Sequence, residues 1–215
     1  MVLNTPKLLS AGGQQPAIYD YADVLRQTGY RIVYLASTSG AYFFSPDSSF
    51  YSAYISTADG GDPDYRGTTG SGALFLTLDL PFNTPANLKG DLYLNIPTKI
   101  IWSPSNISFK ISGAIYHYDG TTETQLSTNQ ASELRKYGTG TNPTTTYSME
   151  NLIFPINSLV HFKIGDKLRI KTNFMIMSSD TAYLHPSFLH DPANRLESSN
   201  ITQFKAYIPY KLDIN

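Results

Sequence analysis

Two groups of side chains in this 215-residue chain are of the types that bind metal ions. The first is Asp59, Asp62 and Asp64, in a glycine-rich segment whose carboxylate oxygens are ligands that Ca²⁺ prefers. The spacing is not that of an EF-hand loop, and no glutamate closes the group. We therefore predict a solvated loop at this position rather than a calcium site.

The second group is His185 and His190, with Asp191 directly after them. Two imidazoles and one carboxylate could ligate a transition metal. The neighbouring Pro186 and Pro192 instead predict a loop in which the histidines are held in a turn by hydrogen bonds. We expect the protein to bind no metal and to need no cofactor.

The sequence contains no recognisable catalytic motif. His117 and His161 fall within predicted strands, where hydrogen bonds to the sheet are the expected use of a histidine. The chain has no cysteine, which excludes disulfides, thiolate zinc sites and cysteine nucleophiles. It also lacks the nucleophile elbow, the zinc-protease motif, the phosphate-binding loop and the dinucleotide fingerprint. No pair of carboxylates stands out for glycoside hydrolysis. We predict that the protein is not an enzyme.

Alternating apolar and polar residues predict an all-β fold. The pattern is clearest after Gly165-Asp166, where Leu168 and Ile170 point to one face and Arg169 to the other. One packed face and one solvated face are typical of an antiparallel sheet. We interpret the basic residues as a solvated strand face. That face consists of Lys163, Lys167, Arg169 and Lys171. The expected core includes Phe109, Ile111, Leu168, Ile170, Phe174 and Ile176.

Strand segments recur at short intervals, with prolines and glycines between them. We expect strands at 30–36, 41–44, 50–57, 73–80, 90–96, 107–118, 121–127, 147–154, 168–177, 181–184 and 201–210. Pro81, Pro85, Pro97 and Pro104 should each mark a strand end or a sheet edge. A turn of helix is expected at 131–136. Together these features predict a single antiparallel jelly-roll sandwich over residues 29–215.

The first 28 residues predict an extended N-terminal arm followed by a short helix. Asp20 could cap that helix, and Gly29 could end it. The arm lacks periodicity and is apolar at four positions. We expect these positions to contact a partner, and they are Leu8, Leu9, Ile18 and Tyr19. Aromatic residues clustered at 42–54 and 116–118 exceed what one sheet face can bury, which also favours a partner.

Charge and hydropathy argue against two classes of partner, nucleic acids and membranes. A net charge of −1 argues against binding nucleic acid through its phosphates. No apolar run has the length of a transmembrane helix, so we expect no membrane contact. The start of the chain has no charged region followed by an apolar one, so we expect no signal peptide. The absence of cysteine favours synthesis in a reducing cytoplasm.

Three segments resemble jelly-roll head decoration and other accessory structural proteins of tailed phages. They are 28–34 with 50–52, the Asp-Gly hairpin at 115–125, and 161–170 with 190–195 and 206–212. TNF-like and C1q-like jelly rolls also carry a Gly-Asp turn before a late strand. The resemblance implies a non-enzymatic protein of the virion, trimeric and seated on the major capsid protein or on other virion proteins. It carries over no site residue.

Two other functions stay open at this point. A carbohydrate-binding or receptor-binding module of a virion fibre or tail would use exposed tyrosines and the Ser, Thr and Asn side chains of the loops. A groove lined by tyrosines or by Trp102 would favour it. A polysaccharide-active enzyme would need two carboxylates facing each other across a cleft.

Overall fold

The computed structural model describes residues 28–38, 41–46, 53–56, 70–102, 106–138, 144–179, 184–190 and 203–211. These residues form strands and connections without a helix, which confirms the predicted all-β class. The strands are β1 (Thr28–Thr38), β2 (Ala41–Ser45), β3 (Ala53–Ser56), β4 (Gly70–Pro81), β5 (Ala86–Trp102), β6 (Ile107–Tyr118), β7 (Glu123–Gln125), β8 (Gln130–Ala131), β9 (Arg135–Tyr137), β10 (Thr144–Phe162), β11 (Lys167–Ser179), β12 (Leu184–His190) and β13 (Lys205–Lys211). Among the described residues, no helix is long and apolar enough to cross a membrane.

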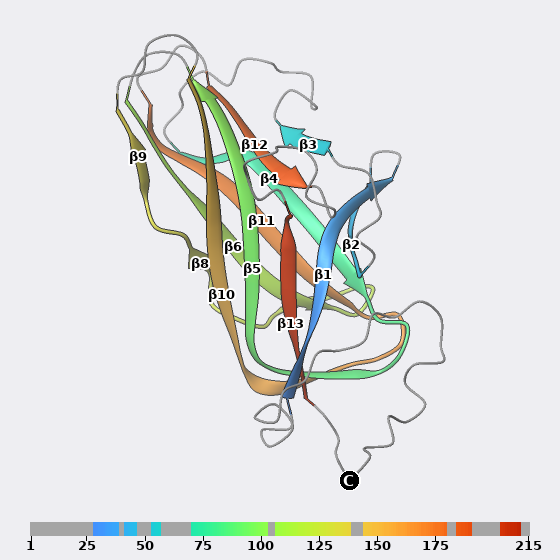
Figure 1. Ribbon diagram of the computed structural model, residues 1–215. Coiled ribbons are helices and arrows are strands. Elements are labelled where there is room, and N and C mark those ends of the chain that lie inside the picture. The colour runs from blue at the N-terminus through green and yellow to red at the C-terminus, as the bar shows by residue number, and fades with distance from the viewer. Residues whose placement is uncertain are drawn as a thin grey trace, which may run out of the picture.

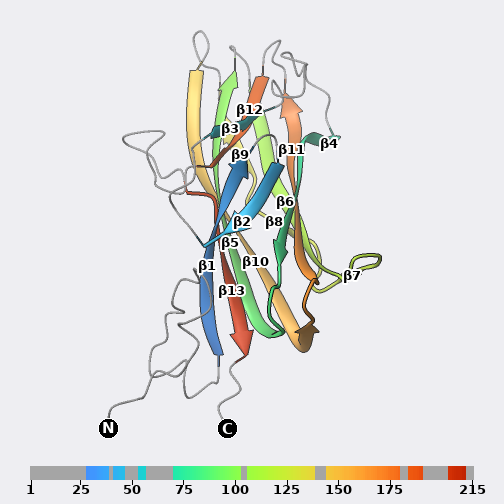
Figure 2. The same ribbon diagram turned by 90° about the vertical axis from the view of Figure 1, so that its right-hand side faces the viewer.

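The strands belong to one curled sheet that packs against itself in two layers (Figures 1 and 2). The first layer contains β3, β12, β5, β13 and β1, with β10 on the other edge of β5. The second contains β2, β4, β11 and β6, with β7, β8 and β9 along β6. The pairing of β2 with β4 is parallel, through Phe43 and Asp79, so the expectation of a purely antiparallel sheet is wrong. The other pairings among the described residues are antiparallel.

A long two-stranded ribbon runs through both layers. In the second layer β4 pairs with β11, and in the first layer their continuations β5 and β10 pair with each other. Two backbone hydrogen bonds join the two segments inside the bend, since Phe82 N donates to Asp166 O at 2.9 Å and Gly165 N donates to Phe82 O at 2.9 Å. Gly165 has φ of 93°, a conformation that favours glycine. The Gly-Asp turn thus forms the corner at which the ribbon folds over the core.

Proline marks fewer strand ends than the sequence predicts. Pro97 lies inside β5, opposite Met149 of β10. On the other edge of β5, β13 pairs up to Asn95 and β12 begins to pair at Thr98. Pro97 therefore falls between two partner strands, where a missing N–H removes no ladder bond on that edge. Pro97 thus marks no strand end and lies at a locally unpaired edge of β5, the second of the two predicted alternatives.

The core lies between the layers and contains every residue predicted for it. All six side chains are fully buried. An unbroken row of aromatic rings crosses the core. Phe109 stacks on Phe174 at 4.8 Å between ring centroids, and Phe174 lies 6.0 Å from Phe188 of the first layer. Phe188 in turn lies 6.1 Å from Phe204. These rings hold the two layers together by burying large apolar surfaces.

Two local predictions fail because strand pairing overrides them. The expected helical turn at 131–136 is instead an irregular edge that follows β6 through β8 and β9. His185 and His190 belong to β12 rather than to a loop, since β12 pairs with both β3 and β5. The predicted arm and helix at 1–28 lie almost wholly outside the described residues, which begin at Thr28.

Candidate binding surfaces

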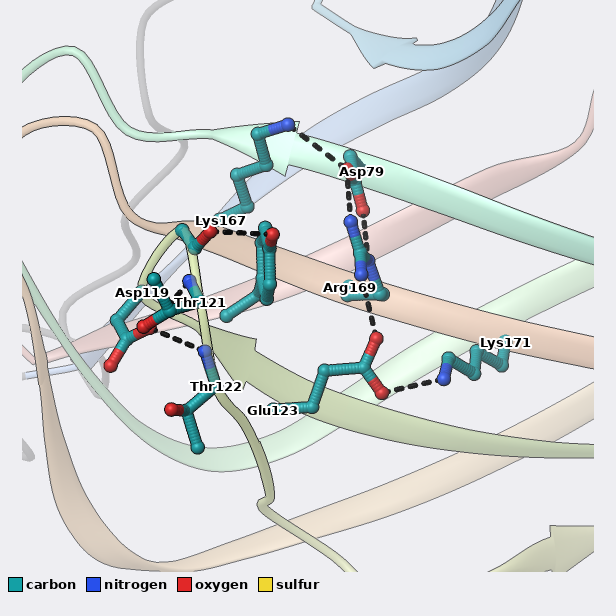
Figure 3. Close-up of polar contacts among 10 residues, drawn as sticks. Asp79, Asp119, Thr121, Thr122, Glu123, Lys167, Arg169 and Lys171 are labelled. Carbon is teal, nitrogen blue, oxygen red and sulfur yellow. Dashed lines mark hydrogen bonds and ion pairs between the residues drawn. The ribbon is translucent and has the colours of Figure 1, made fainter.

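A ladder of charged side chains covers one end of the outer face of the second layer (Figure 3). We call this group the charged ladder, and it consists of Asp79, Glu123, Lys167, Arg169 and Lys171. Arg169 lies at its centre and grips Asp79 with two nitrogens, at 2.7 and 2.9 Å. Its third nitrogen donates to Glu123 at 2.6 Å. Lys167 donates to Asp79 at 3.2 Å and Lys171 to Glu123 at 2.6 Å.

The strand register creates this ladder. Arg169 of β11 lies directly between Asp79 of β4 and Tyr116 of β6, so all three side chains share one face. Glu123 reaches the face from β7, where it pairs with Tyr118. The sequence predicts a solvated basic strand face here, but Lys167, Arg169 and Lys171 each form ion pairs. Lys163 lies apart from them, in the turn before β11.

The same cations cover two of the tyrosines counted as surplus. The Arg169 guanidinium lies 4.0 Å from the ring centre of Tyr118, and Lys171 Nζ lies 4.8 Å from that of Tyr116. Such cation–π contacts occupy the ring faces that a sugar or a partner would need. The Tyr118 hydroxyl donates to Gly120 O at 2.7 Å. These two tyrosines therefore serve the ladder rather than a ligand.

The carboxylates of the ladder are held in their charged form. Hydrogen bonding from Arg169 lowers the pKa of Asp79, and hydrogen bonding from Lys171 and then Arg169 lowers the pKa of Glu123. The pKa of Arg169 is raised, first by Asp79. In the adjoining turn, the N–H groups of Thr122 and Thr121 bond to Asp119 and lower the pKa of its carboxyl to about 2.

We expect stability to fall in acid through these groups. Carboxyls whose pKa is lower in the folded chain contribute stability above their unfolded pKa, near 4. That contribution is lost as the pH falls through the lowered folded values. The double variant Asp79→Asn/Glu123→Gln should therefore lose less stability than the parent between about pH 5 and about pH 2. Urea melts across this range test the prediction, with the exposed Asp91→Asn as control. Parallel pH profiles for the parent and the double variant would contradict it.

The corner of the ribbon is held by a second polar group. The Asp166 carboxylate accepts from Lys163 N at 2.8 Å and contacts His117 Nε2 at 2.7 Å. These two contacts, the backbone one first, lower the pKa of Asp166. The His117 ring lies 4.4 Å from that of Phe162. His117 is thus the sheet-bonded histidine that the sequence predicts, and so is His161, whose Nδ1 lies 2.8 Å from Asn87 Oδ1.

An ion pair with one buried partner links β10 to β9, since Glu150 is buried and Arg135 is 40% exposed. Glu150 of β10 is 1% exposed and shares the inward face with Leu152 and Phe154. Arg135 Nε of β9 donates to its carboxylate at 2.9 Å. Glu150 raises the pKa of Arg135 through this bond. No sequence signal pairs these two residues, since a charged residue in a strand ordinarily points outward.

The outer face of the first layer has a different character. Ile153 of β10, Tyr93 of β5, Tyr207 of β13 and Ile32 of β1 are successive cross-strand partners and form one row, which we call the apolar face. Ile153 is 48% exposed and Tyr93 is 36% exposed. In Figure 1 these four strands lie side by side in front of the second layer. The four members of the row are uncharged, and Lys205 Nζ lies at the edge of the row, 5.6 Å from the ring centre of Tyr207.

The structure describes only some of the residues that the sequence predicts as sites. Asp59, Asp62, Asp64 and Asp191 lie outside the described residues, as do the arm positions Leu8, Leu9, Ile18 and Tyr19. His190 is buried and packs edge-on against Tyr42 at 5.7 Å. Within the described part of the chain, no three His, Asp or Glu side chains are grouped closely enough to hold a metal. The apolar face was missed. The sequence signal for this face is an apolar residue at an outward strand position. Ile153 is an example, since it points outward between the inward residues Leu152 and Phe154.

Comparison with solved structures finds the same fold within longer proteins. A CocE/NonD family hydrolase from Staphylococcus aureus matches with a TM-score of 0.52 at 10% identity, covering 85% of this chain and 37% of the hydrolase. An aminopeptidase from the marine sediment archaeon Thaumarchaeota archaeon matches with a TM-score of 0.51 at 8% identity, covering 86% of this chain and 37% of the aminopeptidase. No protein-family model and no curated protein matches the sequence.

The chain therefore spans 37% of the length of these two proteins, and at such identity the likeness shows the fold alone. The prediction that the protein is not an enzyme is nevertheless wrong as drawn, because the two structures compared above share this fold and are described as a hydrolase and an aminopeptidase. That prediction relied on missing motifs. The larger part of each enzyme has no counterpart in this chain, so motifs missing here say nothing of that part.

Proposed function

We propose that the chain is a jelly-roll assembly module that binds protein partners through the apolar face. The ribbon supports the jelly-roll topology, because a paired two-stranded ribbon folded over a core at one corner is how such sandwiches are built. The apolar face supports the binding role, and the exposure of Ile153 and Tyr93 in one cross-strand row is the observation that carries it.

The composition of the face fits a protein partner. Protein interfaces are enriched in tyrosine and apolar side chains at their centre and depleted in lysine and acidic residues. The row of Ile153, Tyr93, Tyr207 and Ile32 has this composition. The charged ladder on the opposite layer does not, because its charges are paired with one another and its side chains stay 18–38% exposed. We therefore assign docking to the apolar face and contact with solvent to the face that carries the charged ladder.

A particle such as a virion is the setting that we propose for this module, with the chain as one of its structural proteins and a capsid protein or further copies as partners. The resemblance to tailed-phage accessory proteins supports this setting. The second candidate is a role as one domain of a longer hydrolase, and the fold shared with the hydrolase and the aminopeptidase favours it. In either case the face docks a protein surface.

Binding of a carbohydrate or receptor glycan is supported by one further feature. Asn151 and Asn95 are cross-strand partners beside the row, so two amides lie next to Tyr93. Amides and a tyrosine ring can together bond and stack on a sugar. The Tyr93 ring lies tilted by 53° against Tyr30 rather than in one plane with it, which favours a protein over a flat glycan.

The double variant Tyr93→Lys/Ile153→Lys tests the assembly role. Two ammonium groups in the centre of an apolar interface should weaken association about tenfold or more, since central anchors dominate binding energy. Sedimentation or light scattering of the purified protein over a concentration series measures the effect. Thr77→Lys, at an exposed position on the other layer, is the control. A self-association constant that the double variant leaves unchanged would refute assembly of copies through this face.

A further inference from the structure

Arg31 of β1 lies on the inner face of the first layer, near the end at which β1 begins. It pairs with Ile208 of β13, which is fully buried, and directly paired residues of two strands lie on the same face of a sheet (Figure 2). Arg31 also alternates with Val33, another fully buried residue of β1. Ile32 lies between them and points the other way, so Arg31 and the apolar face lie on opposite sides of β1.

Apolar surface lies next to Arg31 on this inner face. Tyr210 of β13 pairs with Gly29 and is therefore the diagonal neighbour of Arg31. The Tyr210 ring lies 6.4 Å from that of Phe82, a buried residue at the corner of the ribbon. On the other edge of β1, the pairing with β2 begins only at Tyr34, so no described strand pairs with β1 there at Arg31. Arg31 is accordingly partly buried rather than fully enclosed.

The guanidinium of Arg31 lacks the partners that Arg135 and Arg169 have, since each of those two bonds to a carboxylate. Arg31 Nε is shielded from solvent without a hydrogen-bond partner, and Arg31 forms no ion pair within the part of the chain that the structure describes. Removing a charged donor from water without an acceptor is unfavourable. Arginine, unlike lysine, does not relieve this cost by losing its proton. An anion bonded to the guanidinium would offset the cost.

The charge at this position fits a carboxylate. Arg31 is the one charged side chain on the described inner face of β1 and β13, because Lys205 and Lys211 pair at outward positions. A single guanidinium matches a planar monoanion, whose two oxygens can accept two parallel N–H bonds. A phosphate dianion would keep one charge uncompensated beside apolar side chains.

We propose that Arg31 anchors a binding site for a carboxylate, at the edge of β1 that β2 leaves unpaired. The ring of Tyr210 provides apolar surface for the group that carries the carboxylate. Such a ligand is either a small organic acid or the free C-terminal residue of a protein chain, and the chemistry that binds it is the same. The site is separate from the apolar face, so it stands or falls independently of the assembly role.

The first test needs no ligand. Arg31→Met keeps an unbranched side chain of similar width and removes the charge. In a buffer without carboxylates, we expect the variant to unfold at the urea concentration of the parent or at a higher one, because an unpaired charge leaves the inner face. A lower urea midpoint for Arg31→Met would show that the guanidinium is already bonded to an acceptor of the chain, and it would overturn the proposal.

The second test follows the Nε–H signal of Arg31 by NMR in the full-length chain. The signal is assigned by its loss in Arg31→Lys. We expect it to shift saturably as N-acetyl-leucine is added at constant ionic strength. The signal of Arg169, whose guanidinium is already bonded to Asp79 and Glu123, should stay in place. N-acetyl-leucinamide, which has no carboxylate, is the matched control and should shift neither signal.

A titration with acetate identifies the source of the carboxylate. Equal midpoints for acetate and N-acetyl-leucine would support a small organic acid. A midpoint about tenfold or more lower for N-acetyl-leucine would support a chain terminus, since burial of its leucine side chain adds affinity. The carboxylate site is overturned if neither acid shifts the Arg31 signal saturably, or if N-acetyl-leucinamide shifts it as far as N-acetyl-leucine does.

Discussion

Replacing Arg135 with alanine should lower the free energy of unfolding by about 1–3 kcal/mol, because the Glu150 carboxylate is buried whereas the Arg135 side chain is 40% exposed and partly screened by solvent. Glu150, its partner, is 1% exposed and faces the interior between the layers. Removal of Arg135 leaves a buried carboxylate without the cation 2.9 Å away that compensates it. An uncompensated buried charge is costly, whereas the intact pair is close to neutral for stability. Equilibrium denaturation in urea measures the difference.

Two controls tie this loss to the charge. Lys136→Ala removes an exposed cation from the same short strand and should change stability by less than about 0.5 kcal/mol. Glu150→Gln, placed in the Arg135→Ala background, removes the buried charge and should recover part of the loss. If Arg135→Ala unfolds at the same urea concentration as the parent, the stability of the fold does not depend on this ion pair.

Replacing Phe174 with alanine should cost about 3–5 kcal/mol, because it removes a large ring from the centre of the core. Phe174 is 0% exposed and contacts Phe109 in its own layer and Phe188 in the other. The substitution would leave a cavity between Phe109 and Phe188, and these rings would lose the contacts through which they join the two layers. The cost therefore includes lost contacts as well as lost burial.

Phe75→Ala is the matched control, since the same side chain is 57% exposed on β4. It should change stability by less than about 0.5 kcal/mol. Comparable losses for the two phenylalanines would mean that the core does not lie where the burial of Phe174 puts it. Both variants can be measured by thermal and urea denaturation of the full-length chain.

The sequence by itself determined the fold class and the composition of the core. Successive side chains of a strand point to opposite faces whatever the strand pairs with, so alternation alone separates inward from outward residues. That is why Leu168, Ile170 and Phe174 were predicted to be buried and are. The same rule correctly placed Lys167, Arg169 and Lys171 on the outside.

Only the tertiary structure decided what each outward residue meets. Arg169 and Asp79 are 90 positions apart in the chain, and strand order and register bring them together. Register also covers Tyr118 with a guanidinium and leaves Tyr93 exposed, although the two tyrosines look alike in the sequence. Local pattern sets the direction of a side chain, whereas its neighbours depend on contacts between distant segments. A binding face is made of such neighbours, so it emerged only once the sheet was assembled.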